Sequence, residues 1–70
     1  MEKVSAHITG TVARLEKKAG DAVSPGDVVV ILESMKMEMP IEATGAGTVR
    51  EIRCAEGQPV AEGDVLVVIE

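Results

Sequence analysis

The chain contains no phenylalanine, tyrosine or tryptophan among its 70 residues. Its core must therefore be built from aliphatic side chains. Valine dominates these, and it favours β-strands because its branched side chain packs well on a pleated surface. A chain of this length buries only about 60% of the surface that it exposes when unfolded, so one domain spanning residues 1–70 is expected.

Basic clusters and long apolar runs are missing as well. The net charge is −5, and Lys17-Lys18 is the densest basic pair. Without a basic surface, and without aromatic rings to stack on bases, nucleic-acid binding is not expected. The longest aliphatic run, Val28 to Leu32, is too short to cross a bilayer, and no basic segment followed by an apolar one indicates a signal peptide. No association with a membrane is therefore expected.

Cysteine and histidine occur once each, as Cys54 and His7. A single cysteine excludes an internal disulfide and favours the reducing cytoplasm as the compartment. Neither residue has partners in the sequence that suggest a metal site or a catalytic pair, so no metal and no catalytic residue is expected. We expect His7 on a surface strand and Cys54 buried among apolar residues.

What the chain does contain is an internal repeat. A shift of 37 residues places Gly10-Thr11-Val12 on Gly47-Thr48-Val49, and Gly26-Asp27-Val28 on Gly63-Asp64-Val65, without a gap. Glycines in register indicate the same backbone path twice, because glycine often marks positions of positive φ or of close approach. Two similar halves, at about residues 6–33 and 43–70, are therefore expected to pack with pseudo-twofold symmetry.

The pattern within each half predicts short strands joined by turns. Val28 to Leu32 and Val65 to Ile69 are apolar at successive positions, which is typical of buried strands, and residues 37–43 alternate with the period of a half-exposed strand. Ser24-Pro25-Gly26-Asp27 predicts a type II turn with glycine at the position that needs positive φ. Glycine or proline interrupts every window long enough for a helix. The pattern predicts an all-β sandwich or flattened barrel of about eight short strands.

The segment between the halves, residues 34–42, carries the candidate site. The tightest hairpin places Met35 and Lys36 at the two central turn positions and Glu33 opposite Glu38. Its inward face is then one apolar set, made of Val30, Leu32, Met39 and Ile41. Opposed glutamates repel, and a two-residue turn usually has Asn or Gly. Two unfavourable local features that occur together at one turn indicate a functional site.

Symmetry adds two expectations about this hairpin. It should lie at one end of the molecule, with both chain termini at the opposite end. Pro40 cannot donate a hydrogen bond to a neighbouring strand, so its strand is expected at a sheet edge or to be irregular there. Spacing alone leaves a plainer interpretation open, in which Lys36 is a solvated turn residue and the methionines fill gaps in the core.

Glu33-Ser34-Met35-Lys36-Met37 resembles the biotin attachment motif of biotinyl domains, in which the lysine stands between two methionines. The likeness covers nearly the whole chain, through Gly20-Asp21, Pro25-Gly26-Asp27, Glu56-Gly57 and Glu62-Gly63-Asp64. It implies an all-β flattened barrel, or sandwich, of two four-stranded antiparallel sheets with pseudo-twofold symmetry and the lysine on a protruding turn. The spacing of the early strands is similar to the compact, thumbless type of biotin carboxyl carrier protein. Lys17 departs from the family, because an aliphatic residue is common there.

The resemblance also implies a function. Lys36 would receive biotin covalently from a biotin protein ligase. It would then carry an activated carboxyl group between the biotin carboxylase and carboxyltransferase sites of a biotin-dependent carboxylase or decarboxylase. The chain would be a non-catalytic carrier and not an enzyme. Met35 and Met37 belong to the motif and are expected to serve ligase recognition. Further candidate ligase contacts are Glu33, Ser34 and Glu38.

Two alternatives stay open at this point. A lipoyl domain of a 2-oxo acid dehydrogenase complex shares the fold, but its lysine resembles D-K-A in context, which Met35 and Met37 do not match. An unmodified hammerhead module that only docks partner proteins is the second alternative. The intact M-K-M sequence and the short connection around Lys36 count against it.

Overall fold

The computed structural model describes residues 2–70, which form eight strands and no helix. In chain order they are β1 (Glu2–Ser5), β2 (Gly10–Leu15), β3 (Ala22–Val23), β4 (Val28–Ser34), β5 (Met37–Glu42), β6 (Gly47–Ile52), β7 (Pro59–Val60) and β8 (Val65–Ile69). They make two four-stranded antiparallel sheets, in the orders β1-β8-β6-β3 and β5-β4-β2-β7. The predicted all-β fold class is confirmed. Within residues 2–70 there is accordingly no long apolar helix that could span a membrane.

The two sheets repeat each other at the spacing seen in the sequence. β2, β3 and β4 begin at residues 10, 22 and 28, and β6, β7 and β8 begin at residues 47, 59 and 65. Even the irregularities repeat, because the β2–β4 ladder passes over Ala13 and the β6–β8 ladder passes over Arg50. The edge strand β5 of one sheet corresponds to the edge strand β1 of the other. The pseudo-twofold arrangement is therefore present down to single residues.

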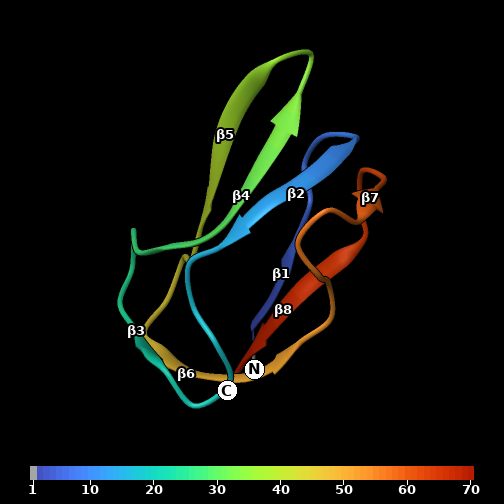
Figure 1. Ribbon diagram of the computed structural model, residues 1–70. Helices are drawn as coiled ribbons and strands as arrows, with labels where there is room; N and C mark the ends of the chain where they lie inside the picture. Colours follow the sequence, from blue (N-terminus) through green and yellow to red (C-terminus); the bar gives the residue numbers. More distant parts are fainter. Residues whose placement is uncertain (1) are drawn as a thin grey trace.

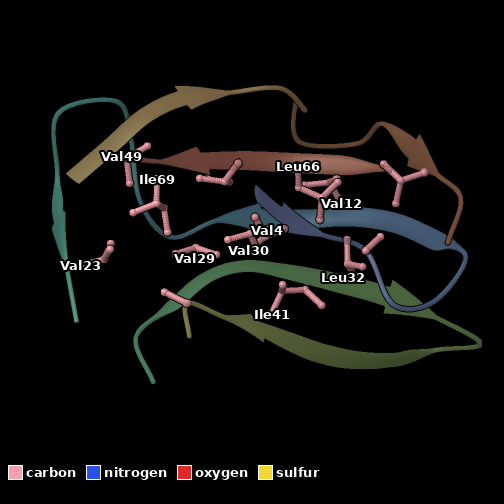
Figure 2. Close-up of a cluster of buried hydrophobic side chains, with 14 residues drawn as sticks. Val4, Val12, Val23, Val29, Val30, Leu32, Ile41, Val49, Leu66 and Ile69 are labelled. Carbon is pink, nitrogen blue, oxygen red and sulfur yellow. The ribbon is translucent and has the colours of Figure 1, made fainter. Parts of the chain in front are cut away.

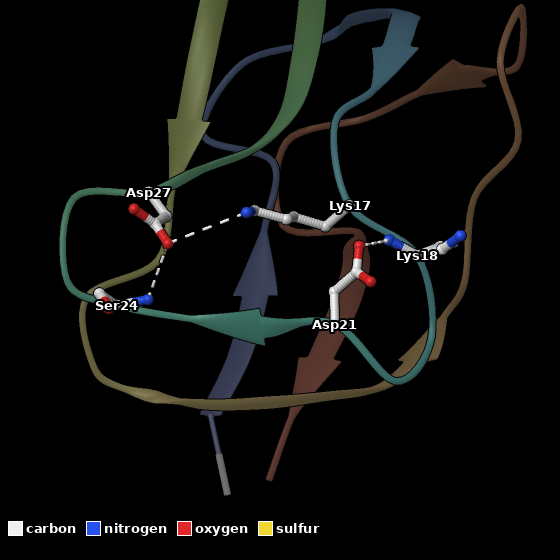
Figure 3. Close-up of polar contacts among 5 residues, drawn as sticks. All are labelled: Lys17, Lys18, Asp21, Ser24 and Asp27. Atoms are coloured by element: carbon white, nitrogen blue, oxygen red, sulfur yellow. Dashed lines mark hydrogen bonds and ion pairs between the residues drawn. The ribbon is translucent and has the colours of Figure 1, made fainter.

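The turns explain why glycines recur in register. Gly26 has a φ of 88°, and the Asp27 N–H donates to the carbonyl of Ser24 at 3.0 Å, as expected of the predicted type II turn. The Asp27 carboxylate also accepts from the Ser24 N–H at 2.9 Å (Figure 3). The second half repeats this turn at Gly63, whose φ is 95°. Both turns thus join the strands by the same hydrogen bonds.

Gly10 and Gly47 serve a different purpose, which is close approach between strands. A Cβ atom at Gly10 would collide with the carbonyl oxygen of Glu33, and one at Gly47 with the carbonyl oxygen of Glu70. Only glycine lets β2 lie so close to the end of β4, and β6 so close to the end of β8.

The core lies between the two sheets and is wholly aliphatic (Figure 2). Its largest fully buried side chains are Leu32, Leu66, Ile69, Val12, Val29, Val30, Val49 and Val67. Within residues 2–70 no polar or charged side chain is buried. No aromatic side chain is available to fill this core, so branched aliphatic side chains from the strands of both sheets fill it.

The molecule is elongated, with extents of 31 × 19 × 17 Å. The β4–β5 hairpin projects at one end, and the N- and C-termini lie together at the other end (Figure 1). This is the placement that the repeat predicted. Pro40 lies in β5, which is an edge strand as predicted.

Two expectations about single residues were wrong in part. His7 is exposed, but it lies in the bend of residues 7–9 and not in a strand. The reason is that β1 and β2 belong to different sheets, so the chain must cross between the layers there. Cys54 is half-buried and packs against the core without belonging to it, because it follows β6 where the chain leaves that sheet.

Candidate modification site on the β4–β5 hairpin

The hairpin ends in a two-residue turn made of Met35 and Lys36. β4 and β5 pair in the predicted register, with Ser34 opposite Met37 next to the turn. Buried Leu32 and Ile41 fix that register, because a slip of one residue would turn them out into solvent. The core therefore determines which two residues form the turn.

Both turn residues have a left-handed backbone, with φ of 56° at Met35 and 66° at Lys36. Two positive φ values are the pattern of a type I′ turn, which suits the twist of the flanking strands. For residues with a Cβ atom this conformation costs about 1–2 kcal/mol each, so Asn or Gly would be the easier choice. Strain kept at an exposed tip is typical of functional sites.

The side chains at the tip point into solvent. Met35 is 90% exposed and Met37 is 58% exposed, while Lys36 between them is also exposed. Within residues 2–70 no hydrogen bond or ion pair engages the Lys36 amine. Filling gaps in the core therefore does not account for Met35 or Met37. Of the three methionines on the hairpin, only Met39, two residues further along β5, is partly buried.

Acidic side chains flank the tip. Glu33 and Glu38 are paired across the two strands, as predicted, and both are exposed. They alternate with the buried positions, so they lie on the outer face of the sheet. Lys36 lies beside this pair, and acylating its amine would remove the single positive charge of residues 33–38. Ser34, the remaining candidate, is half-buried at the base of the turn.

Gly10 supports the hairpin, a role that the sequence analysis did not assign to it. A Cβ atom there would meet the Glu33 carbonyl and lie 3.4 Å from the Cβ of Ser34. The base of the turn therefore rests directly on Gly10. The repeated glycines at 10 and 47 were the available signal, although the sequence alone did not show which strand approached them.

Two surface hollows lie elsewhere. One, of about 470 Å³, lies between the edge strands β1 and β5, and another, of about 400 Å³, is lined by residues that include Cys54 and Asp64. Neither is lined by Lys36 or the two methionines beside it. Among residues 2–70 no three His, Cys, Asp or Glu side chains are grouped so that they could hold a metal ion. Lys36 thus stands on the projecting hairpin of a small β-sandwich (Figure 1), away from both hollows.

Comparison with known proteins agrees with this architecture. The family model described as "Biotin-requiring enzyme" matches residues 2–69. The biotinylated protein TB7.3 homolog of Mycobacterium leprae is 48% identical over 46 residues, which are 66% of this chain and 65% of that protein. The biotin/lipoyl attachment protein of Bacillus subtilis is 48% identical over 44 residues, which are 63% of this chain and 60% of that protein.

A solved structure extends the comparison to nearly every residue. The urea carboxylase of Kluyveromyces lactis contains a segment with a TM-score of 0.93 and 38% sequence identity, covering 99% of this chain and 6% of that one. The chain belongs to the family whose model is described as "Biotin-requiring enzyme", and its fold is that of a domain within a much larger carboxylase. The predicted family is therefore confirmed, and so is biotin as the cofactor of that family.

Proposed function

We propose that Lys36 is the site of covalent biotin attachment and that the chain acts as a carboxyl carrier. One observation supports this most directly. In a member of a biotin-requiring family, an exposed lysine without a partner stands at the apex of a projecting hairpin, between two exposed methionines.

The role of the protein in attachment is to present the amine. No described side chain forms a hydrogen bond or ion pair with the Lys36 amine, so the biotin protein ligase has to supply the base that takes a proton from it. The free amine then attacks the carboxyl group of biotin in its adenylate, an amide bond forms, and AMP leaves. The exposed turn suits this step because the ligase can enclose the tip without unfolding the sandwich.

Once attached, biotin supplies the chemistry of carboxyl transfer, and the protein supplies its position. The hairpin projects at one end of the molecule, so a group on Lys36 can enter the active site of a biotin carboxylase and then that of a carboxyltransferase (Figure 1). Tethering raises the local concentration of the reactive group at both sites. The chain itself makes and breaks no bond in this scheme, so it is a carrier and not an enzyme.

The test is the intact mass of the protein before and after incubation with a biotin protein ligase, biotin and ATP, followed by peptide mapping. We expect one biotin adduct, on Lys36. Lys36→Arg should accept none, while Lys18→Arg, at another exposed lysine, should accept biotin as the parent does. Biotin on Lys36→Arg would refute the assignment.

The same assay separates the two alternatives. If Lys36 accepts lipoate from a lipoyl ligase, but no biotin, the chain is a lipoyl domain. A lysine that accepts neither would leave a docking module.

A further inference from the structure

The methionines of the described chain are gathered at one place. Met35, Met37 and Met39 all lie in or beside the turn of the β4–β5 hairpin, and no methionine belongs to the core. Methionine usually fills gaps in hydrophobic cores, so this distribution calls for another account. The valine, leucine and isoleucine side chains of the core have no group that mild oxidants attack. Oxidation of methionine would therefore change the tip and leave the sandwich as it is.

The three thioethers differ in exposure along one short segment. Met35 is 90% exposed, Met37 is 58% exposed, and Met39 is partly buried on the inward face. An oxidant in solution must reach the sulfur atom itself, so accessibility governs which methionine reacts. The structure thus ranks them in the order Met35, Met37, Met39, and the two that react first are the two neighbours of Lys36.

The other oxidisable side chain, Cys54, is half-buried and less reactive than an exposed cysteine would be. Burial raises the pKa of the Cys54 thiol, which lowers the fraction of thiolate, the form that peroxide attacks. Cys54 also follows β6 in the second half of the repeat, whereas Lys36 lies on the hairpin between the halves.

We propose that Met35 and Met37 form a reversible oxidation site that controls acylation of Lys36. Hydrogen peroxide transfers one oxygen atom to each thioether. The O–O bond breaks, an S–O bond forms, sulfur loses two electrons, and water leaves. A methionine sulfoxide reductase reverses the change with two thiols, which become a disulfide as the oxygen leaves in water.

The consequence for Lys36 follows from polarity and rests on the function proposed above. A thioether can be buried against a ligase at no polar cost, whereas a sulfoxide brings a strong dipole to the same surface. Burying a polar group that finds no hydrogen-bond partner weakens docking, so we expect transfer of biotin to slow by about tenfold or more. No core residue changes, so the fold should not be affected.

The first experiment maps the modification. Unbiotinylated protein is treated with graded hydrogen peroxide, and peptide mass spectrometry follows sulfoxide at each methionine. We expect Met35 to react first, Met37 next and Met39 last, while the thermal transition followed by far-UV circular dichroism stays in place. Equal rates at Met35 and Met39 would show that exposure does not govern the reaction. If the thermal transition shifts when Met35 and Met37 are oxidised, the oxidation damages the fold and is not a specific control of Lys36.

The second experiment measures the rate of biotin transfer to untreated, oxidised and reductase-treated protein with a biotin protein ligase, biotin and ATP. We expect the tenfold loss on oxidation to be reversed by the reductase. In the double variant Met35→Leu and Met37→Leu, peroxide should not change the rate relative to the same untreated variant. An oxidised parent that accepts biotin at the untreated rate overturns the control of Lys36. If the untreated protein accepts no biotin, the proposed function itself fails, and the control of Lys36 fails with it.

Discussion

The two halves of the chain share one backbone, and the hairpin that follows the first half adds a turn that the shared backbone does not explain. There β4 continues through Met35 and Lys36 into β5, and the ladder runs on to the turn. Just before the turn Thr11 lies opposite Glu33, and in the second half Thr48 and Glu70 form the matching pair, with backbone hydrogen bonds of 2.9 and 3.1 Å. Features that recur in both halves therefore serve the fold. The turn at Met35 and Lys36 has two positive φ values without a glycine, and it is a candidate for function.

A smaller difference lies where each half crosses between the sheets. In the first half the Lys17 ammonium reaches toward the Asp27 carboxylate, at 3.9 Å (Figure 3). The matching residues of the second half are Cys54 and Asp64, and the shorter cysteine side chain lies in a hollow of about 400 Å³. The repeat thus acts as an internal control, because each half shows which other side chains the same backbone accommodates.

The largest effect should come from filling the space above the two close-approach glycines. Gly47→Ala would place a Cβ atom against the Glu70 carbonyl and 2.8 Å from Cγ2 of Ile69. Overpacking of this kind costs about 1–3 kcal/mol, and backbone atoms on one side put it at the upper end of that range. Urea unfolding followed by far-UV circular dichroism measures the loss. An unchanged midpoint would show that β6 and β8 can separate freely.

Gly10→Ala sharpens the comparison because it makes the matching change beside the candidate site. We expect a loss of stability of about 1–3 kcal/mol, somewhat smaller than at Gly47 because the clashing methyl group of Ile69 has no counterpart there. In addition, the base of the hairpin at Ser34 must shift, so biotin transfer should slow. Gly47→Ala is the matched control, measured at an equal fraction of folded protein. Equal slowing in both variants would mean that Gly10 supports the fold alone.

The next effect concerns the turn at Met35 and Lys36. Met35→Asn should raise the free energy of unfolding by about 1 kcal/mol, because asparagine tolerates the left-handed backbone better than methionine. The same replacement at Met37, which lies in β5 and has no positive φ, should bring no gain. Urea unfolding of both variants decides the point. If Met35→Asn is no more stable than the parent, the turn stores no strain.

The sequence was sufficient to predict the hairpin because two independent patterns agreed there. Alternation along residues 37–43 fixed which side chains face inward, and the repeated glycines fixed where each half turns. Together they left Met35 and Lys36 as the only pair that could form the tightest turn. The positive φ values of the turn could not be predicted from the sequence in the same way, because neither Met nor Lys prefers positive φ. The core imposes them through the register.

Other parts escaped prediction because they depend on contacts between distant residues. β1 has no glycine or turn signal of its own and forms because Val4 packs in the core while the strand pairs with β8. The two-residue strands β3 and β7 are too short for any periodicity. Cys54 looked like a core residue by its type alone, and only its place at a crossing between sheets shows why it is half-buried.

A contact of Glu2 breaks the symmetry between the edge strands and makes a smaller prediction. Its carboxylate accepts from the Thr44 hydroxyl at 2.6 Å, from the Thr44 N–H at 3.0 Å and from the Gly45 N–H at 3.2 Å. These bonds, first that of the Thr44 hydroxyl, lower the pKa of the Glu2 carboxyl from its ordinary value. The matching position in β5 is Met39, which cannot form such a link.

The lowered pKa fixes the direction of the pH dependence. The Glu2 contact stabilises the fold above the carboxyl pKa of the unfolded chain, and this contribution disappears as the pH falls through the lower folded-state value. Because the group is solvent-exposed, we expect Glu2→Gln to cost less than about 1 kcal/mol at pH 7. Urea unfolding of both proteins at pH 7 and pH 3 tests this. A difference that is as large at pH 3 as at pH 7 would assign the effect to packing.

The smallest effect should come from giving the second half the lysine that the first half has. Cys54→Lys would lay an aliphatic stem along the hollow and bring an ammonium group to Asp64, as Lys17 does to Asp27 (Figure 3). Exposed ion pairs contribute about 0.2–1 kcal/mol, so we expect the free energy of unfolding to rise by only a few tenths of a kcal/mol.

Cys54→Leu fills the same hollow without charge and is the matched control. The gain of Cys54→Lys over Cys54→Leu should shrink in 1 M salt, because salt screens exposed charges. If the two variants are equally stable at low salt, the cation contributes nothing and the hollow responds to apolar filling alone. The difference between the halves at this place would then concern the volume of the side chain and not its charge.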